Sequence, residues 1–469
     1  MPFYATNFPV SEKGVLTAPL ITTLVSAWMG SLCMGASIGF TAPASESLSE
    51  DYFTTPEHST WFASLLPIGA VVGCALSSLV AQAMGRRFAL LVSALGYMGG
   101  YGIIMSANTV FTVLLGRFIT GIATGMVSLC VPAYIAEISL PVQRGSMGGV
   151  LQFAITLGIM FTQVVSVYVD WNGLARTCLV LAIPFLALYQ FNIESPRWLM
   201  LHGRRPEALD ALAKLRGPAA KLEDECLLME TVFMQVPTPF SHLLLAMHVH
   251  FLQQFSGINA VIFYSKNLLD DAGLSLSGHE STIIFAAFQV VATAVAVRLM
   301  EPFSRKTLLT TSAYICVFSM MTIATLYSVN REDDDSDPYG KTSVSQQLPI
   351  VFVALYMIGF SVGLGPVTWI LTAELVPLRQ HGIYLCMVCA FNWTLVFLVT
   401  WFFRVVHEAL ELSGLGLFFS AITFISALLV SFFMPETQDR SLEDILRMTA
   451  KDKDNVSVTS RRSAASRKS

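Results

Sequence analysis

The sequence predicts an all-α membrane protein of twelve transmembrane helices, arranged as two related six-helix bundles with short cytoplasmic helices. Three observations predict this class. Of 469 residues, 54% are hydrophobic and only 13% are charged, whereas soluble domains carry about 25% charged residues. Apolar runs of roughly 20 residues, long enough to cross a bilayer, recur along the whole chain. Short charged cassettes between these runs occur twice, in the same order.

Each apolar run is expected to form one membrane-spanning helix. Gly and Pro recur in several of them, as expected for tilted or kinked helices that surround a cavity. We place an N-terminal bundle at residues 18–192 and a C-terminal bundle at 241–434. The runs cover residues 18–41, 59–83, 88–107, 110–137, 145–169, 174–192, 242–269, 280–301, 307–329, 347–374, 382–405 and 412–434.

The duplicated cassettes indicate an internal repeat. One cassette would fit an ordinary helix end, but three in register predict a two-half transporter whose site lies where the halves meet. In the Glu cassette, a glycine follows the glutamate by eight residues in both copies. Gly-Arg-Arg at 85–87 returns as Ser-Arg-Lys at 304–306, Glu137 returns as Glu374, and Ile-Glu-Ser-Pro-Arg at 193–197 returns as Met-Pro-Glu-Thr at 434–437.

The distribution of Lys and Arg predicts that both termini face the cytoplasm. Basic residues gather in the segments on the same side of the membrane as the termini, and the outer loops hold few, as in the positive-inside rule. The cytoplasmic parts are then the N-terminus at 1–17, a linker at 193–240 and a tail at 435–469. Helical periodicity around 207–215 predicts short helices in the linker. No organelle address stands out, so we expect the plasma membrane.

The charged residues of the cassettes are candidates for a cytoplasmic latch. The planar guanidinium of Arg binds a carboxylate through two hydrogen bonds. A pair that joins the two halves is made when the inner side is closed and broken when it opens, which is the differential interaction a conformational switch requires. The alternative is that these charges only anchor helix ends and set topology. The candidates are Arg86, Arg87, Glu137, Arg144, Glu194, Arg197, Glu301, Arg305, Glu374 and Glu436.

Several motifs resemble the sugar porter family of the major facilitator superfamily, over nearly the whole chain. The most specific is Gln-Gln-Phe-Ser-Gly-Ile-Asn-Ala-Val at 253–261, which is similar to the family's seventh span. The resemblance implies the major facilitator fold and a sugar substrate, and it is greatest to insect facilitated trehalose carriers and their hexose-carrying relatives. Further matches lie at residues 116–118, 194–199, 365–369, 391–393 and 435–437.

Uncharged polar side chains at mid-span depth are candidates for the sugar site. Sugar hydroxyls both donate and accept hydrogen bonds, and amide side chains do the same without charge. The alternative is hydrogen bonding between helices, worth about 0.6 kcal/mol on average. By the resemblance, Phe263 and Tyr264 help to close the outer gate, and Gln289 replaces an asparagine of the sugar site. The resemblance assigns sugar contacts to Gln152, Gln253, Gln254, Asn259, Trp369, Asn392 and Trp393.

The absence of carboxylates from the middle of the spans favours facilitated diffusion. Ser37 stands where proton-coupled relatives of the family have an aspartate, and a serine carries no proton at physiological pH. We therefore predict uniport by alternating access. One alternative is proton symport through His248 or His250 in span seven, and another is a non-transporting sugar sensor.

Other classes of function find no support in the sequence. The chain has no metal-spaced His/Cys cluster, phosphate loop or nucleophile elbow, the signatures of many catalytic sites. We therefore expect no enzymatic activity, cofactor or metal. The expected partners are the sugar, either a hexose or trehalose, and the lipid bilayer, with no nucleic acid. By the family resemblance we expect a monomer.

Overall fold

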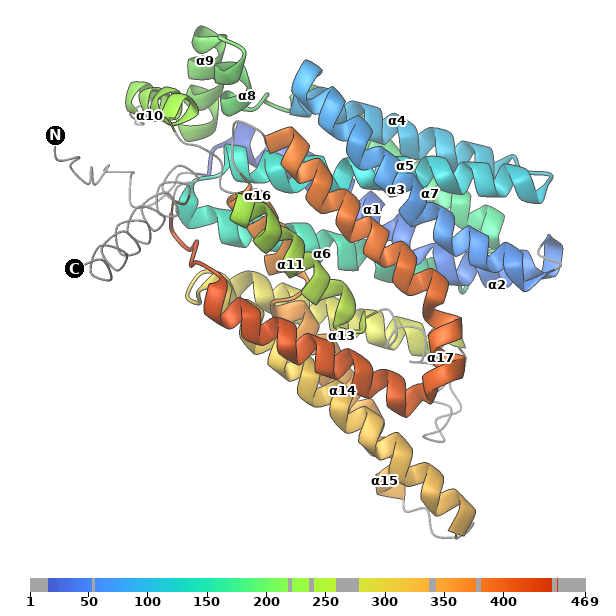
Figure 1. Cartoon of the computed structure of the whole chain (residues 1–469). Coiled ribbons are helices and arrows are strands. Elements are labelled where there is room, and N and C mark those ends of the chain that lie inside the picture. The colour runs from blue at the N-terminus through green and yellow to red at the C-terminus, as the bar shows by residue number, and fades with distance from the viewer. Residues whose placement is uncertain are drawn as a thin grey trace, which may run out of the picture.

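The computed structural model consists of helices and their connections throughout the part of the chain that it describes (Figure 1). The described residues are 16–52, 55–217, 222–235, 240–258, 278–336, 343–376, 381–440 and 445. Most of the N-terminus at 1–17 and of the tail at 435–469 therefore lies outside them, as do Asn259, Phe263 and Tyr264.

The first half of the chain forms α1 to α7 and a short 3₁₀ turn. Polar caps begin several of these helices: Thr17 precedes α1, Thr109 precedes α5 and Asp170 precedes α7, and each side chain accepts a backbone N–H of the first turn, as preferred N-cap residues do. The bounds are α1 Ala18–Gly39, α2 Thr41–Asp51, α3 Pro56–Met84, α4 Arg86–Met105, α5 Val110–Ile138, α6 Pro141–Val165, α7 Trp171–Leu188 and η1 Tyr189–Phe191.

The second half forms α11 to α17. Span ten is broken: α15 ends at Val362 and α16 begins at Pro366, which is favoured at a first helical position because its missing N–H would have had no partner. The long α17 combines two spans, which meet near Glu411. The bounds are α11 Phe240–Phe255, α13 Gly278–Leu299, α14 Arg305–Ser336, α15 Ser343–Val362, α16 Pro366–Leu375 and α17 His381–Phe433.

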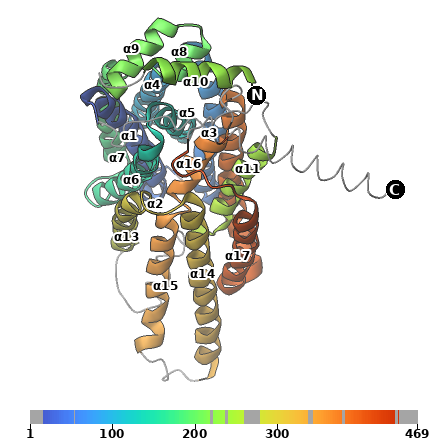
Figure 2. The same cartoon turned by 90° about the vertical axis from the view of Figure 1, so that its left-hand side faces the viewer.

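Three short helices lie together at one end of the molecule (Figures 1 and 2). They are α8 Pro196–Leu201, α9 Arg205–Arg216 and α10 Leu222–Gln235. Trp198 Nε1 donates to the Gln82 carbonyl at 2.9 Å, and Arg216 Nη1 donates to the Ile138 carbonyl at 2.6 Å. These bonds fasten the linker helices to the C-terminal ends of α3 and α5 in the first half.

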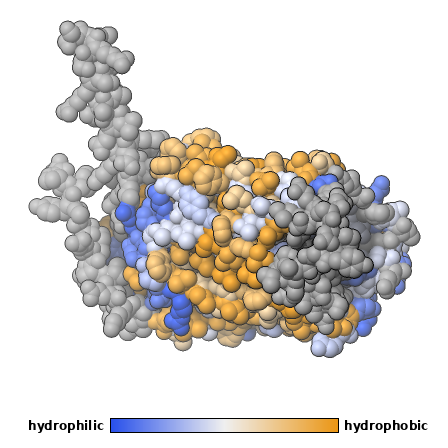
Figure 3. Space-filling model, turned by 90° about the horizontal axis from the view of Figure 1, so that it is seen from below, coloured by the Kyte–Doolittle hydropathy of each residue, from blue (hydrophilic) through white to orange (hydrophobic). Residues whose placement is uncertain are grey.

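Eleven helices of the described residues are long and apolar enough to cross a membrane. They correspond to the predicted spans except the seventh, of which the structure describes α11 and the residues up to Ile258. On the face shown in Figure 3, hydrophobic residues cover much of the middle, and hydrophilic residues gather toward the ends. The two halves meet along α3 against α17 and along α6 against α13.

Candidate functional site

The break in span ten provides the backbone around which the amide side chains gather. At residues 363–365 the helix is interrupted, so carbonyl groups there are available to side chains. Gln253 Nε2 donates to the Leu364 carbonyl at 2.9 Å and to the Gly365 carbonyl at 3.3 Å. Many membrane transporters build their substrate sites from interrupted helices near the midplane of the membrane.

A second amide pair links α11 to α17. Gln254 Nε2 donates to Asn392 Oδ1 at 2.9 Å, and both side chains are buried. Gln253 Oε1 lies 3.5 Å from Gln254 Nε2. The three amides Gln253, Gln254 and Asn392 therefore form a connected polar group within the second half.

The first half contributes Gln152 from α6 to the same place. This side chain is buried, and its Cδ lies 3.5 Å from a Cβ built on Gly365. Gln152 thus reaches across to the broken helix of the other half. Gln289, on α13, is also buried. Amides from both halves line this region and leave it without net charge.

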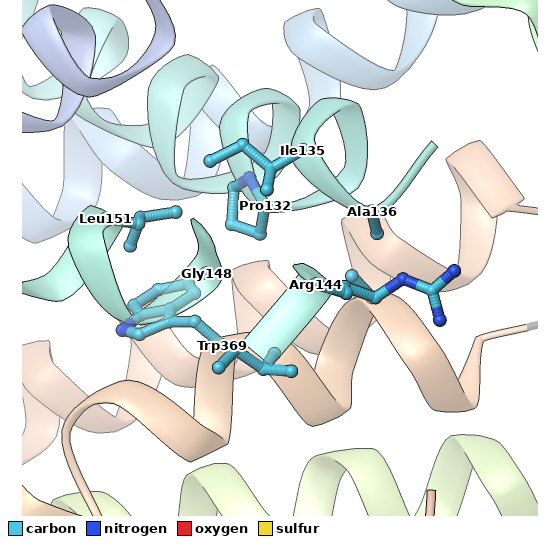
Figure 4. Close-up of a pocket in the computed structure, with 9 residues that line it drawn as sticks. Pro132, Ile135, Ala136, Arg144, Gly148, Leu151 and Trp369 are labelled. Carbon is cyan, nitrogen blue, oxygen red and sulfur yellow. The ribbon is translucent and has the colours of Figure 1, made fainter. Parts of the chain in front are cut away.

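Trp369 lies beside these amides on α16. Its ring meets the His250 ring edge to face, with centroids 5.1 Å apart, and His250 Nε2 lies 2.7 Å from Thr372 Oγ1. A pocket runs from Trp369 toward Arg144, between α5, α6 and α16 (Figure 4). His248 differs from His250: its Nε2 lies 3.3 Å from the Ser426 carbonyl, on the far part of α17.

The end of the first half that lies next to the linker helices contains a buried ion pair. Arg86 Nη2 donates to Glu137 Oε1 at 2.7 Å and Arg86 Nε donates to Glu137 Oε2 at 3.0 Å. Glu194 accepts the backbone N–H of Arg86 at 2.9 Å and that of Arg87 at 3.3 Å. Burial raises the pKa of Glu194, although hydrogen bonds from the backbone of Ser195, Arg86 and Arg87 and the Arg86 charge oppose the rise.

The second half repeats this capping arrangement at the N-terminus of α14. Glu436 accepts the backbone N–H of Arg305 at 3.1 Å and that of Lys306 at 3.2 Å. Partial burial on its own would raise the pKa of Glu436. Hydrogen bonds from Ser304 and from the backbone N–H groups of Gln438, Lys306 and Arg305 outweigh this effect, so the pKa is lowered.

One ion pair of the candidate latch joins the two halves. Arg144 Nη1 of α6 lies 3.7 Å from Glu374 Oε1 of α16, and both side chains are buried. Arg144 also donates to the Arg440 carbonyl at 3.2 Å, and the Thr437 hydroxyl donates to Glu374 at 2.6 Å. Arg305 Nη2 lies 2.5 Å from a Cβ built on Gly145, so its guanidinium rests against α6.

Two residues of the candidate latch, Arg87 and Glu301, are placed differently from the expected carboxylate pairs. The Arg87 guanidinium donates to the Gln190 carbonyl at 3.2 Å and lies 4.8 Å from the centroid of the Tyr189 ring. Arg197 is buried at the start of α8. Glu301 is exposed in the turn before α14, and its carboxylate forms no ion pair with the described residues.

Ser128 makes a contact between the two halves that the sequence did not indicate. It lies on α5 in the first half, and its Oγ accepts a 2.9 Å hydrogen bond from Trp393 Nε1 of the second half. A serine in an apolar span usually bonds to its own helix, as Ser128 also does through Gly125. Nothing in its sequence surroundings distinguishes it from the other span serines.

Comparison with known proteins adds a family and a fold. The model described as "Sugar (and other) transporter" matches residues 20–449. The chain is 32% identical over 445 residues to the facilitated trehalose transporter Tret1 of Polypedilum vanderplanki, covering 91% of this chain and 87% of that protein. It is 31% identical to the Tret1 of Aedes aegypti, over 91% of this chain and 54% of that one. The chain therefore spans about half the length of some of these relatives.

Two solved structures have the same fold. The proton:xylose symporter XylE bound to 6-bromo-6-deoxy-D-glucose matches with a TM-score of 0.79 at 22% identity, over 91% of this chain and 98% of that one. The inward-open form of XylE from E. coli matches with a TM-score of 0.68 at 22% identity, over 91% and 99%. These likenesses confirm the predicted twelve-helix all-α fold.

Proposed function

Because the chain belongs to the sugar (and other) transporter family, we propose that it carries a sugar across a membrane by facilitated diffusion. The relatives named facilitated trehalose transporters make trehalose the first substrate to test, with hexoses as the alternative. The two halves, α1 to α7 and α11 to α17, rock about the amide-lined centre and open it to each side in turn.

The meeting of amide side chains from both halves carries this proposal. Gln152 of α6 lies beside Gly365, while Gln253 and Gln254 of α11 bond to the broken helix and to Asn392. Each amide both donates and accepts, which matches sugar hydroxyls. The amides are bonded to one another and to backbone carbonyls. A sugar that binds here therefore replaces hydrogen bonds that the amides already make.

The position of the buried carboxylates supports uniport. Within the described part of the chain, the buried acidic residues are Glu137 and Glu374, and both lie at inner helix ends, paired with Arg86 and Arg144. Neither reaches the amide group. The amide group therefore has no carboxylate that could bind and release a proton as the sugar moves.

The experiment that tests this function is counterflow in proteoliposomes. Vesicles preloaded with unlabelled trehalose or glucose should accumulate the same labelled sugar transiently, with no ion gradient imposed. A sorbitol-loaded set controls for volume changes. Absence of counterflow for trehalose and for every hexose tested would reject sugar transport and leave the sensor alternative, which sugar binding without flux would support.

Proton symport is the second candidate, and the position of His250 favours it. This side chain is fully buried, packs on Trp369 and lies next to the amide group. Voltage-clamped membranes should show no sugar-evoked proton current if the carrier is a uniporter. A current that disappears in His250→Gln would replace uniport with symport.

We further propose the setting in which this carrier works. The polar ends of the helices that hold the charged network, together with the linker helices α8 to α10, face the cytoplasm, with both chain termini. The bias of Lys and Arg toward that side supports this orientation. We also propose that the carrier is a monomer and lies in the plasma membrane. Tag accessibility in intact and permeabilised cells tests the orientation.

A further inference from the structure

We propose that Ser128 positions the site tryptophan Trp393 and, through the same bond, holds the inner side of the carrier closed. This inference rests on the proposed function. It assigns a role to Ser128, a residue of the first half, in positioning Trp393, a residue of the second half.

The hydrogen bond between these residues is buried and crosses the interface. Trp393 Nε1 donates to Ser128 Oγ at 2.9 Å, and each residue is 3% exposed. An indole has a single donor and no acceptor, so a buried tryptophan without this partner loses its one hydrogen bond. In the low dielectric of the membrane interior such a loss is costly.

The local structure of α5 leaves Ser128 ready to accept. Its hydroxyl donates to the Gly125 carbonyl at 2.9 Å, one turn back along the same helix. This bond uses the hydroxyl hydrogen and fixes the rotamer, and the oxygen lone pairs point to the indole. Trp393 follows Asn392, whose Oδ1 accepts from Gln254. Trp393 therefore lies on the same turn of α17 as a member of the amide pair.

The bond lies in a wall of contacts that must separate when the inner side opens. α3 and α17 pack along this wall, and the Gln82 side chain lies so close to Gly382 that an added Cβ would be 1.9 Å from Gln82 Nε2. Nearer the inner end, Arg144 meets Glu374. Rocking the halves apart at this end breaks the Ser128–Trp393 bond with these contacts.

Two native cysteines lie beside Ser128, and a disulfide between them would report whether the two halves are in contact there. The Cys74 sulfur of α3 lies 3.9 Å from Ser128 Oγ, and the Cys389 sulfur of α17 lies 4.0 Å from the Ser128 carbonyl. The two thiols lie beside each other, and both are buried while the wall is closed. A thiol that diamide reaches while the wall is open adds to the N=N bond of diamide, and the second thiol displaces the hydrazine when the wall closes. One S–S bond forms, and the two protons and two electrons of the thiols pass to diamide. The cross-link joins the halves only while the wall is closed.

The experiment compares Ser128→Ala with Ser128→Thr, which keeps the hydroxyl, and with Ser93→Ala. Ser93 is a matched control, because it is a buried serine whose hydroxyl donates to Ala89 within its own helix. Full-length protein in proteoliposomes is treated with diamide, and the Cys74–Cys389 peptide is quantified by mass spectrometry. Uptake gives KM and kcat, and tryptophan emission is recorded in a Trp393→Phe background and in its absence.

The expected result is a loss specific to Ser128→Ala. Its cross-linking rate falls about three-fold and its KM for sugar entry rises by about the same factor, the size of an average interhelical hydrogen bond, while Ser128→Thr and Ser93→Ala behave as wild type. The Trp393 contribution to emission changes in wavelength, because the indole loses its hydrogen-bond acceptor. In Trp393→Phe, adding Ser128→Ala changes neither the cross-linking rate nor the KM.

Three results would overturn the proposal. They are wild-type protein that does not cross-link, Ser128→Ala with unchanged cross-linking and KM, and Ser128→Thr as impaired as Ser128→Ala. If Ser128→Ala does not fold, cross-linking in Trp393→Phe replaces it and must fall by the same factor. Cross-linking and emission do not need transport, so a carrier that fails counterflow would reject the proposed function and leave this contact measurable.

Discussion

The carboxylates of Glu194 and Glu436 cap equivalent helices in the two halves of the molecule. Glu194 accepts the first backbone N–H of α4 from Arg86 at 2.9 Å, and Glu436 accepts the first N–H of α14 from Arg305 at 3.1 Å. The unsatisfied N–H groups and the dipole of a helix N-terminus favour such an anion. The repeat seen in the sequence is thus a repeated structural device, although the two carboxyl groups have different surroundings.

The first prediction is that these two glutamates give opposite pH dependences of stability. Because burial raises the pKa of Glu194, the folded state holds that proton more tightly, and stability falls as the pH rises above the ordinary Glu pKa of about 4.3. The pKa of Glu436 is lowered, so its contribution is present above about 4.3 and is lost as the pH falls below it. Melting temperatures of purified protein across pH measure both effects.

The variants Glu194→Gln and Glu436→Gln isolate each contribution. Wild type should lose stability relative to Glu194→Gln as the pH rises through that window. The greater stability of wild type relative to Glu436→Gln should be lost as the pH falls. Parallel curves for the two variants would contradict the assignment, because the only difference invoked is the burial and bonding of each carboxylate.

The capping pairs also show what the sequence could and could not predict. Apolar runs and repeated cassettes suffice to predict twelve helices in two bundles, because span length and charge placement are local properties. The partner of each arginine is not local. Glu374, which corresponds in sequence to Glu137, pairs with Arg144 across the interface instead of with Arg305. Ser128 was missed for the same reason: its partner lies 265 residues away.

The second prediction concerns the ion pair between Arg144 and Glu374. Replacing Glu374 with Gln leaves the Arg144 guanidinium buried beside a neutral group, and removing one member of a buried pair costs about 3–5 kcal/mol. The closed inner side loses this bond, while the amide group is untouched. Because about 1.4 kcal/mol is a factor of ten in rate, turnover should change by more than about ten-fold, and equilibrium sugar binding should change little.

Zero-trans uptake and equilibrium binding on the same preparation separate these two quantities. Glu207→Gln is the control, because it removes an exposed pair with Arg204 in the linker, where an ion pair contributes about 0–1 kcal/mol. A collapse of sugar binding in Glu374→Gln would show that this residue acts on the site itself and not on the closing of the inner side.

The third prediction concerns the Gln254–Asn392 pair. Gln254→Ala removes the hydrogen bond to Asn392 Oδ1 and a donor and acceptor for sugar hydroxyls. With two hydrogen bonds lost at about 1 kcal/mol each, uptake at low sugar concentration should fall at least about ten-fold, with surface expression unchanged. Gln163→Ala is a matched control: Gln163 is buried and donates to the Gly39 carbonyl, away from the amide group. Equal losses in both variants would remove Gln254 from the site.

The last prediction tests the packing that holds the first half together. α1 and α6 pack backbone to backbone, since a Cβ on Gly35 would lie 2.0 Å from the Ile155 carbonyl oxygen and one on Gly158 would lie 2.2 Å from the Leu32 oxygen. Small residues allow this approach between membrane helices. Gly35→Ala must push α1 from α6, and such overpacking costs about 1–3 kcal/mol or more.

Gly99→Ala makes the same chemical change where there is space, because nothing lies within 4 Å of a Cβ built on Gly99 of α4. Alanine favours a helix over glycine by about 1 kcal/mol, so this variant should match or exceed wild type in melting temperature. Gly35→Ala should melt lower and yield less folded protein in detergent. If the two variants melted alike, the backbone contact between α1 and α6 would not be what fixes their separation, and side-chain packing around it would have to carry that role.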